Sequence, residues 1–271
     1  MSAVPSQPGA DTTNAPLVTV MHDAYGVPGV VQLTLNRPDA FNSLSEALID
    51  ALQAELNTLA AAPAARVVVI AGAGRAFCAG HDLREMRAAP SLAYYKELFA
   101  RCAKLMLTIQ KMPQPVIARV HGVATAAGCQ LVAMCDLAVA ADTARFAVSG
   151  INLGLFCSTP AVPLTRNVSR KAAFEMLMTG EFIDAAAALR EGLVNRVVAP
   201  DELDAAVTTL AATICGKSRE AVEMGKGLFY RQLEMGIEAA YQLAGQTMAC
   251  NMMTDPALDG VQAFIERRGS K

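Results

Sequence analysis

The chain has 271 residues, of which 53% are apolar and 18% charged, and its formal net charge is −2. This length and apolar content suffice for one large domain with a substantial core. The charge excludes a basic field for nucleic acid or an anionic membrane, and no apolar run reaches the about 20 residues that span a bilayer. The N-terminus shows no secretory signal pattern, so we expect a soluble cytoplasmic protein.

Cysteine and histidine usage bears on disulfides and metals. The seven cysteines are scattered and form no C-x-x-C pair, which predicts reduced, buried thiols. Only three histidines are present, so a histidine-rich metal site is not expected.

The first elements in chain order are a leader, two strands and a helix. Residues 1–15 are rich in Pro, Ser and Thr and predict a disordered leader. The β-branched runs 17–21 and 30–35 are separated by Gly and Pro, which predicts an antiparallel pair. Ser43 and Glu46 fit a capping box at the start of a helix. Its amphipathic stripe consists of Leu44, Leu48, Leu52, Leu56 and Leu59.

Strands and helices then alternate. The apolar runs 66–71, 116–120 and 137–140 predict buried strands, and the segments 94–111 and 126–134 predict helices. This alternation predicts the α/β class with a parallel sheet.

The last third of the chain changes character. Residues 170–179 and 185–192 predict helices, 193–198 an extended segment, and the chain from Asp201 onward is helical in pattern. We therefore predict a core over residues 16–200 and a C-terminal helical region over residues 201–271.

Two turns of small residues each follow a buried strand. The first, GAGRAFCAGH, ends at His81, and the second, HGVATAAG, leads into a helix that begins near Ala127. Small side chains leave the first backbone N–H groups of such a turn open to a ligand. Two converging N–H groups would form an oxyanion hole, worth about 3 kcal/mol per donor. The alternative is that the small residues only allow helices to pack tightly on the sheet. Neither turn has the spacing of a dinucleotide site or a P-loop.

Four segments, LNRPDAFNSL, RVVVIAGAGRAFCAGHDL, PVIARVHGVATAAGCQLVAMCDLAVAADTARFAV and LMTGEFIDAAAALREGLVNRVV, occur in this order and resemble the crotonase (enoyl-CoA hydratase/isomerase) superfamily. The resemblance runs from about Leu17 to the C-terminus. It implies a ClpP/crotonase ββα spiral core with C-terminal helices for trimerisation, and hence a homotrimer or a dimer of trimers. It also implies an acyl-CoA substrate, no cofactor besides the coenzyme A of that substrate, and no nucleic-acid or membrane partner.

The resemblance carries site residues onto this chain. The backbone N–H groups of His81 and Ala127 match the oxyanion-hole donors, although relatives more often carry Gly at the second position. The positions that resemble the coenzyme A-contacting strips are Arg37, Asp39, Ala40, Phe41, Arg75, Phe77, Ala79, His81, Asp82 and Leu83. An arginine among them, Arg37 or Arg75, could neighbour the phosphates.

The hydration residues are replaced. Hydratases of this superfamily use two glutamates, whose positions match Gln130 and Gly150 here. An amide does not titrate and glycine has no side chain, so two-carboxylate acid–base catalysis is not available. The turn LFCSTP also replaces a Pro-Gly-rich turn that helps to place the catalytic water in hydratases.

Several assignments stay open. Cys157 is either a nucleophile or an inert buried thiol, and the His81 side chain could carry a proton. Asp136 is expected to be structural. The chain is therefore expected to be a crotonase-type acyl-CoA enzyme, nominally an enoyl-CoA hydratase/isomerase, that stabilises a thioester enolate. A different crotonase-type reaction, namely isomerisation, decarboxylation or thioester hydrolysis, is an alternative. Alternatively, it is a non-catalytic acyl-CoA-binding or regulatory protein, or a scaffold without a ligand.

Overall fold

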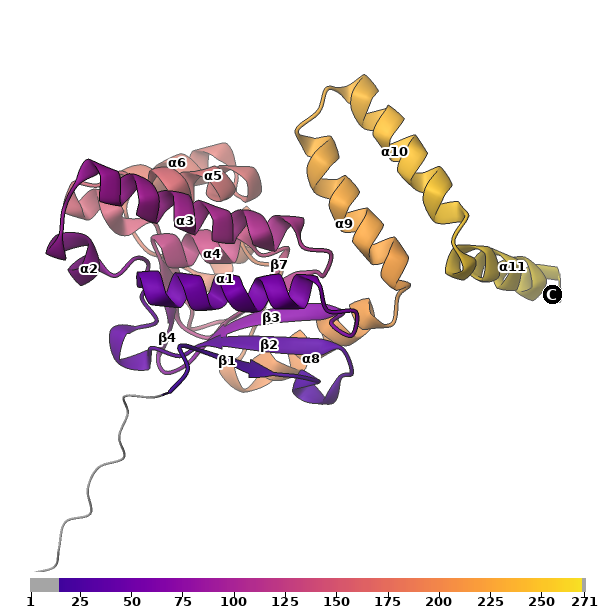
Figure 1. Cartoon of the computed structure of the whole chain (residues 1–271), viewed down its shortest axis with the longest axis horizontal. Coiled ribbons are helices and arrows are strands. Elements are labelled where there is room, and N and C mark those ends of the chain that lie inside the picture. Colours follow the sequence, from indigo (N-terminus) through magenta and orange to yellow (C-terminus); the bar gives the residue numbers. More distant parts are fainter. Residues whose placement is uncertain (1–14, 270–271) are drawn as a thin grey trace, which may run out of the picture.

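The computed structural model describes residues 15–269, so all of the predicted leader except Ala15 lies outside the described residues. A six-stranded sheet forms the centre of the molecule (Figure 1). Only its edge pair β1–β2 is antiparallel, and the other neighbours run parallel, which confirms the α/β prediction. In spatial order the strands are β1 (Val18–Met21), β2 (Val30–Leu35), β3 (Val67–Gly72), β5 (Val116–Val120), β7 (Leu137–Ala141) and β10 (Arg196–Val198).

A second sheet of four short strands was not predicted from the sequence. Its spatial order is β4 (Ala76–Cys78), β6 (Val123–Thr125), β8 (Arg145–Ala147) and β9 (Ile183–Asp184). Each strand has two or three residues, too few to show a period of two. Strands β4, β6 and β8 pair in parallel, and β4 and β6 belong to the two small-residue segments.

The two faces of the large sheet carry different helices. Val31, Leu33 and Leu35 of β2 join the same buried cluster as the leucines of α1 (Glu46–Ala60), whereas Val30 packs with Leu203 of α8 (Leu203–Cys215). Figure 1 shows α1 above the sheet with α3 (Leu92–Lys111) and α4 (Ala127–Met134), and α8 below it. This alternation along β2 follows from the period of two in a strand.

The N-cap of α1 differs from the predicted one. Ser45 caps the helix, because its side chain accepts a hydrogen bond from the Leu48 N–H. Ser43 is instead hydrogen-bonded to Arg37 and Asp82, so the predicted capping box with Glu46 is wrong.

The remaining α-helices lie between the strands of the two sheets or after the last strand. They are α2 (Leu83–Ala88), α5 (Ser158–Asn167), α6 (Arg170–Thr179), α7 (Ala185–Glu191), α9 (Arg219–Leu233), α10 (Ile237–Met252) and α11 (Asp255–Gly269), together with the 3₁₀ turn η4 (Ser149–Leu153). Helices α9 to α11 extend away from the body of the molecule (Figure 1). The last strand ends at Val198, but the domain limits at residues 15 and 200 stay a prediction.

A buried ion pair ties α9 to the core. The Lys226 Nζ donates to Asp136 Oδ2 at 2.7 Å and to the carbonyls of Ile109 and Gln114 at 2.8 Å each. Asp136 also accepts hydrogen bonds from Tyr230 and the Val116 N–H, so it holds β5 and α9 together. The expected structural role of Asp136 agrees with these contacts.

Candidate functional site

A pocket of about 260 Å³ lies where the two small-residue segments meet the start of α5. Of the described residues that line it, none is Asp, Glu, Lys or Arg. His81, Ala127, Gly150 and Cys157, which lie far apart in the sequence, all line this one pocket. Such an enclosed apolar site with few polar groups is typical of small-molecule binding.

The backbone of His81 is oriented by Leu44. The Leu44 N–H donates to the Gly80 carbonyl at 2.7 Å, and the Asp82 N–H donates to the Leu44 carbonyl at 3.1 Å. His81 lies between Gly80 and Asp82, the two residues that bond to Leu44. In such a parallel bridge, the N–H and C=O of the middle residue point to the opposite side. The His81 N–H therefore faces away from Leu44.

Ala127 is the first residue of α4, so its N–H has no partner within the helix. Within residues 15–269, neither this N–H nor that of His81 donates a hydrogen bond. The two turns touch each other, because a Cβ added at Gly80 would lie 3.2 Å from the Ala127 nitrogen and 2.9 Å from the Ala126 Cβ. The turns are thus adjacent beside the pocket.

Tight packing explains part of the small-residue pattern as well. A Cβ added at Gly128 would lie 2.1 Å from the Cys78 carbonyl oxygen, so α4 approaches β4 at a distance that only glycine allows. The packing alternative therefore accounts for Gly128, whereas Gly80, Ala126 and Ala127 lie against each other at the pocket.

The side chain of His81 is shielded. Both ring nitrogens are buried and have no hydrogen-bond partner among the described residues, and the ring packs edge-on against Phe99 at 5.6 Å between centroids. Burial lowers the pKa of His81 to about 4, so the imidazole is neutral at pH 7.

Gln130 lies one turn further along α4 and is only 4% exposed. Its Oε1 atom is buried without a hydrogen-bond partner among the described residues, and Gln130 is not part of the pocket lining. The amide is therefore close to the site in the chain but does not form the pocket wall.

Gly150 occupies a position with no room for a side chain. An added Cβ would lie 2.6 Å from the Leu155 carbonyl oxygen and 2.8 Å from the Cys157 Sγ. The Gly150 N–H donates to that sulfur at 3.3 Å. The loop between these residues has closed over the space that a second carboxylate would need.

Cys157 does not have the environment of a reactive thiolate. Burial raises its pKa, and the hydrogen bond from Gly150 offsets this only in part. Its sulfur acts as a hydrogen-bond acceptor within the pocket wall. The inert interpretation is the one these contacts favour.

The predicted coenzyme A contacts divide into several groups. Ala79 and Leu83 line the pocket with His81. Phe77 is fully buried in the core, and its side chain is not part of the pocket lining. It was assigned from its place in the motif, although β4 turns it inward.

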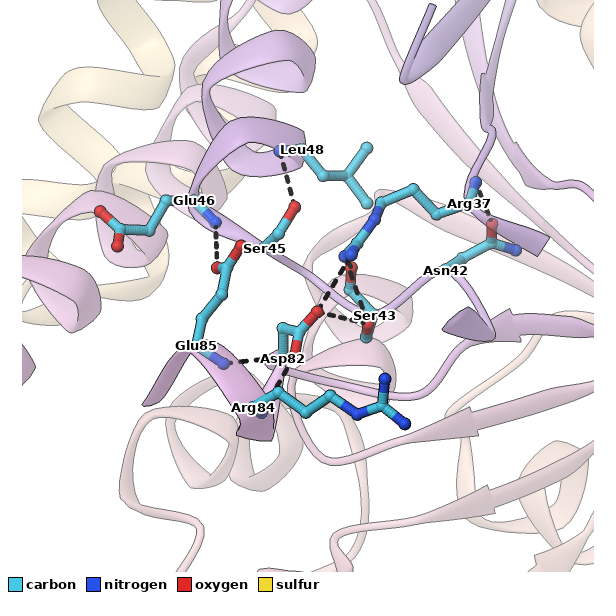
Figure 2. A network of polar contacts seen from close by, with 9 residues as sticks. All are labelled: Arg37, Asn42, Ser43, Ser45, Glu46, Leu48, Asp82, Arg84 and Glu85. Carbon is cyan, nitrogen blue, oxygen red and sulfur yellow. Dashed lines mark hydrogen bonds and ion pairs between the residues drawn. The ribbon is translucent and has the colours of Figure 1, made fainter. Parts of the chain in front are cut away.

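Arg37 and Asp82 are paired with each other rather than open to a phosphate. The Arg37 Nη2 lies 3.0 Å from the Asp82 Oδ2, and Figure 2 shows this pair at the centre of a polar network. Asp39 and Phe41 are exposed and Ala40 is half-buried. The Arg75 guanidinium lies 4.3 Å from the centre of the Phe41 ring, which leaves Arg75 as the arginine at this surface.

The pocket lining includes further residues outside the predicted set of site residues. Ser149 lines the pocket, and its hydroxyl lies 2.9 Å from that of Thr125. Three apolar residues of the lining were missed from the sequence, namely Met86 of α2, Phe99 of α3 and Leu153 of η4, whereas Leu155, Phe156 and Pro160 belong to the LFCSTP turn. Exposed apolar side chains in a loop, such as Leu153, are the signal that could have found them.

The described residues limit other kinds of site. No helix among residues 15–269 has the length and hydropathy needed to cross a membrane. In the same part of the chain, no group of three or more His, Cys, Asp and Glu is placed to hold a metal ion.

Comparisons with known proteins identify the family of this chain. A mitochondrial enoyl-CoA hydratase domain-containing protein 3 from Xenopus laevis is 44% identical over 93% of this chain and 84% of its own length. The human protein of that name is 43% identical over 90% of this chain and 81% of its own. These relatives are named mitochondrial, so the expectation of a cytoplasmic protein is contradicted.

Solved structures match as well. An enoyl-CoA hydratase from Mycobacterium smegmatis is 63% identical, with a TM-score of 0.91 over 93% of this chain and 97% of that one. The human domain-containing protein 3 has a TM-score of 0.88 at 41% identity, over 93% of this chain and 98% of that one. These neighbours confirm the predicted crotonase fold. The sequence profile described as enoyl-CoA hydratase/isomerase matches residues 27–271, and the chain belongs to this family.

Proposed function

We propose that the pocket binds an acyl-CoA thioester and holds its carbonyl oxygen between the backbone N–H groups of His81 and Ala127. The observation that carries this proposal is that both residues line one pocket while neither N–H donates a hydrogen bond within residues 15–269. Two such donors stabilise an enolate or a tetrahedral oxyanion by about 3 kcal/mol each. No cofactor beyond the substrate's own coenzyme A is needed for this role.

The acyl group would occupy the apolar part of the pocket. The large apolar side chains in its lining include Leu83, Phe99, Leu155 and Phe156. Burying an acidic or basic acyl group among them, with no charged partner in the lining, would be costly. An uncharged acyl chain is therefore the substrate that these walls favour.

The proposed reaction is not two-carboxylate hydration. Gln130 cannot titrate, and the Gly150 position has no room for a carboxylate. Stabilisation of an enolate remains useful for isomerisation, decarboxylation or thioester hydrolysis, which require a proton carrier outside the usual glutamate pair. Ser149 is the pocket hydroxyl that could orient a water molecule.

A second candidate is acyl-CoA binding without turnover. The absence of Asp, Glu, Lys and Arg from the described pocket lining favours it. His81 and Cys157 are the titratable side chains there, and burial disfavours the charged form of both.

Two measurements separate these candidates. Calorimetric titration with butyryl-CoA, with free coenzyme A as control, is expected to show binding that depends on the thioester. Turnover of crotonyl-CoA is expected to be at least about a thousandfold below that of a family member with both glutamates, because each acid–base group contributes about 10²–10⁴. Robust hydration would contradict the proposed chemistry, and absence of binding would contradict the site itself.

We also propose a homotrimer, or a dimer of trimers, assembled through the C-terminal helices. Helices α9 to α11 expose large apolar side chains, including Phe229, Ile237, Tyr241 and Met253. Exposed apolar surface of this kind favours association. Sedimentation equilibrium is expected to give three or six chains, and a monomer at micromolar concentration would contradict the proposal.

A further inference from the structure

The segment that carries His81 is fastened to the turn before α1 by side chains outside the pocket (Figure 2). The Arg37 Nη2 lies 3.0 Å from the Asp82 Oδ2, and the Arg37 Nη1 donates to the Ser43 carbonyl at 2.6 Å. The Ser43 hydroxyl is 3.4 Å from the same Asp82 oxygen. One arginine thus links the turn before α1 with the residue that follows His81.

The start of α2 is capped by Asp82, and α2 in turn contacts the start of α1. Asp82 accepts hydrogen bonds from the N–H groups of Arg84 at 3.0 Å and Glu85 at 3.4 Å, and so caps α2. Glu85 reaches back and accepts from the Glu46 N–H at 2.9 Å, at the start of α1 (Figure 2). Because the residue after His81 caps α2 and Glu85 of α2 accepts from the start of α1, the His81 segment has little freedom to rotate.

The charged state of this link is stable near neutral pH. Burial by itself would raise the Asp82 pKa, but the hydrogen bonds from Arg37 and the α2 amides outweigh it and lower the pKa. Neither Arg37 nor Asp82 lines the pocket. They touch the site only through the backbone around His81.

We propose that Arg37 and Asp82 are positioning residues, whose ion pair acts together with the Leu44 bridge to set the direction of the His81 N–H. This inference rests on the proposed oxyanion hole and identifies the residues that orient one of its two donors, the His81 N–H. Loss of the ion pair would weaken recognition of the thioester oxygen without removing any contact to the rest of the ligand.

The competing assignment of Arg37 is contact with the coenzyme A phosphates. Its guanidinium already donates to the Asp82 carboxylate and the Ser43 carbonyl, and its side chain is 22% exposed. A phosphate would have to displace these partners. The two roles predict different losses, because a phosphate contact acts equally on every coenzyme A derivative.

The test compares butyryl-CoA with S-butyl-CoA, a thioether that lacks the carbonyl oxygen. Calorimetry gives the affinity ratio of the two ligands for the full-length wild-type protein, Arg37→Met and Asp82→Asn. Asn retains a capping oxygen for α2 but loses the ion pair. The matched control is Arg119→Met, since Arg119 forms a similar ion pair with Asp204, its side chain is 21% exposed, and neither residue lines the pocket.

We expect the wild type and Arg119→Met to share the same preference for the thioester. Arg37→Met and Asp82→Asn should lose about tenfold of it, as for one misdirected hydrogen bond, with unchanged affinity for the thioether. Should Arg37→Met not fold, Arg37→Gln replaces it, because Gln removes the charge of the ion pair but keeps a hydrogen-bond donor.

Two results would overturn the inference. If both variants bound both ligands as tightly as the wild type does, the ion pair would not orient the amide. If Arg37→Met lost the same affinity for both ligands, Arg37 would be a phosphate contact. A wild type without thioester preference would instead contradict the proposed oxyanion hole, and the positioning role with it.

Discussion

The N–H of Gly150 donates a hydrogen bond to the sulfur of Cys157, with the nitrogen and sulfur 3.3 Å apart. This bond closes the loop that forms one wall of the pocket. Because the Leu155 carbonyl oxygen also lies 2.6 Å from the place of a Cβ on Gly150, any side chain there meets backbone.

Substitution of this glycine is therefore expected to damage the fold rather than to restore hydration. Gly150→Glu should lower the free energy of unfolding by about 1–3 kcal/mol, as in other overpacked sites, and leave crotonyl-CoA hydration unchanged. Urea unfolding and a spectrophotometric hydration assay check both effects. The control is Gly260→Glu, at an exposed position of α11 where an added Cβ meets nothing within 4 Å. Equal stability of the two variants would show that the loop yields easily.

Cys157 is expected to act as a hydrogen-bond acceptor and not as a nucleophile. Cys157→Ala leaves the buried Gly150 N–H without a partner and should cost about 1–3 kcal/mol in urea unfolding. Cys157→Ser keeps an acceptor and should cost less. If Cys157→Ser abolished a turnover that the wild type performs, the thiol would be the nucleophile after all.

The buried imidazole of His81 predicts a pH-dependent stability. Its pKa is about 4 in the folded chain against an ordinary value of 6.5, so the unfolded state binds more protons between these values. The free energy of unfolding should therefore fall as the pH drops from 6.5 to 4, by about 3 kcal/mol at 1.36 kcal/mol per pKa unit.

Urea unfolding of the wild type and His81→Gln at pH 7 and pH 4.5 checks this contribution. The variant does not titrate at this position and should lose less stability on acidification. His121, whose pKa is also lowered by burial, contributes to both proteins and cancels in the difference. Identical losses would mean that the His81 ring is protonated normally in the folded state.

Gln130→Glu places a carboxyl group in a buried position whose present amide oxygen has no partner among the described residues. Burial raises a carboxyl pKa, so the variant should be less stable than the wild type at pH 7 and recover towards acidic pH. Hydration of crotonyl-CoA should not rise, because the second carboxylate is missing. An increase of about a hundredfold, the low end for one acid–base group, would contradict this view.

Removal of the ammonium group at the base of α9 should be severe. Lys226→Met leaves Asp136 buried without its ion-pair partner, which typically costs about 3–5 kcal/mol. Thermal unfolding is the measurement, and Lys171→Met, at an exposed position on α6, is the control. A small shift in both variants would mean that Tyr230 and the Val116 N–H suffice to hold Asp136.

Hydrophobic periodicity was sufficient to predict the large sheet and its helices. The runs 30–35 and 116–120 became strands β2 and β5, and the leucine stripe became the buried face of α1. Short strands such as β4 carry too few residues for a pattern. The choice between Ser43 and Ser45 as N-cap depended on Arg37 and Asp82, a contact that joins distant parts of the chain.

The motifs were a better guide to which backbone segments lie at the candidate site than to which side chains face the ligand. His81 and Ala127 line the same pocket, as the two turns suggested. Phe77 and Arg37 were assigned to the ligand, but the first is in the core and the second is paired with Asp82. Which way a side chain turns depends on neighbours that a single sequence does not reveal.

The closed loop at Gly150 also sets an order on evolutionary change. With this backbone, a carboxylate introduced at residue 150 by one substitution would come at a loss of stability, since the Leu155 carbonyl lies where the side chain would begin. The loop would have to be remodelled first, through insertions or substitutions that bring no immediate catalytic gain. Acquisition of two-carboxylate chemistry would thus pass through less stable intermediates.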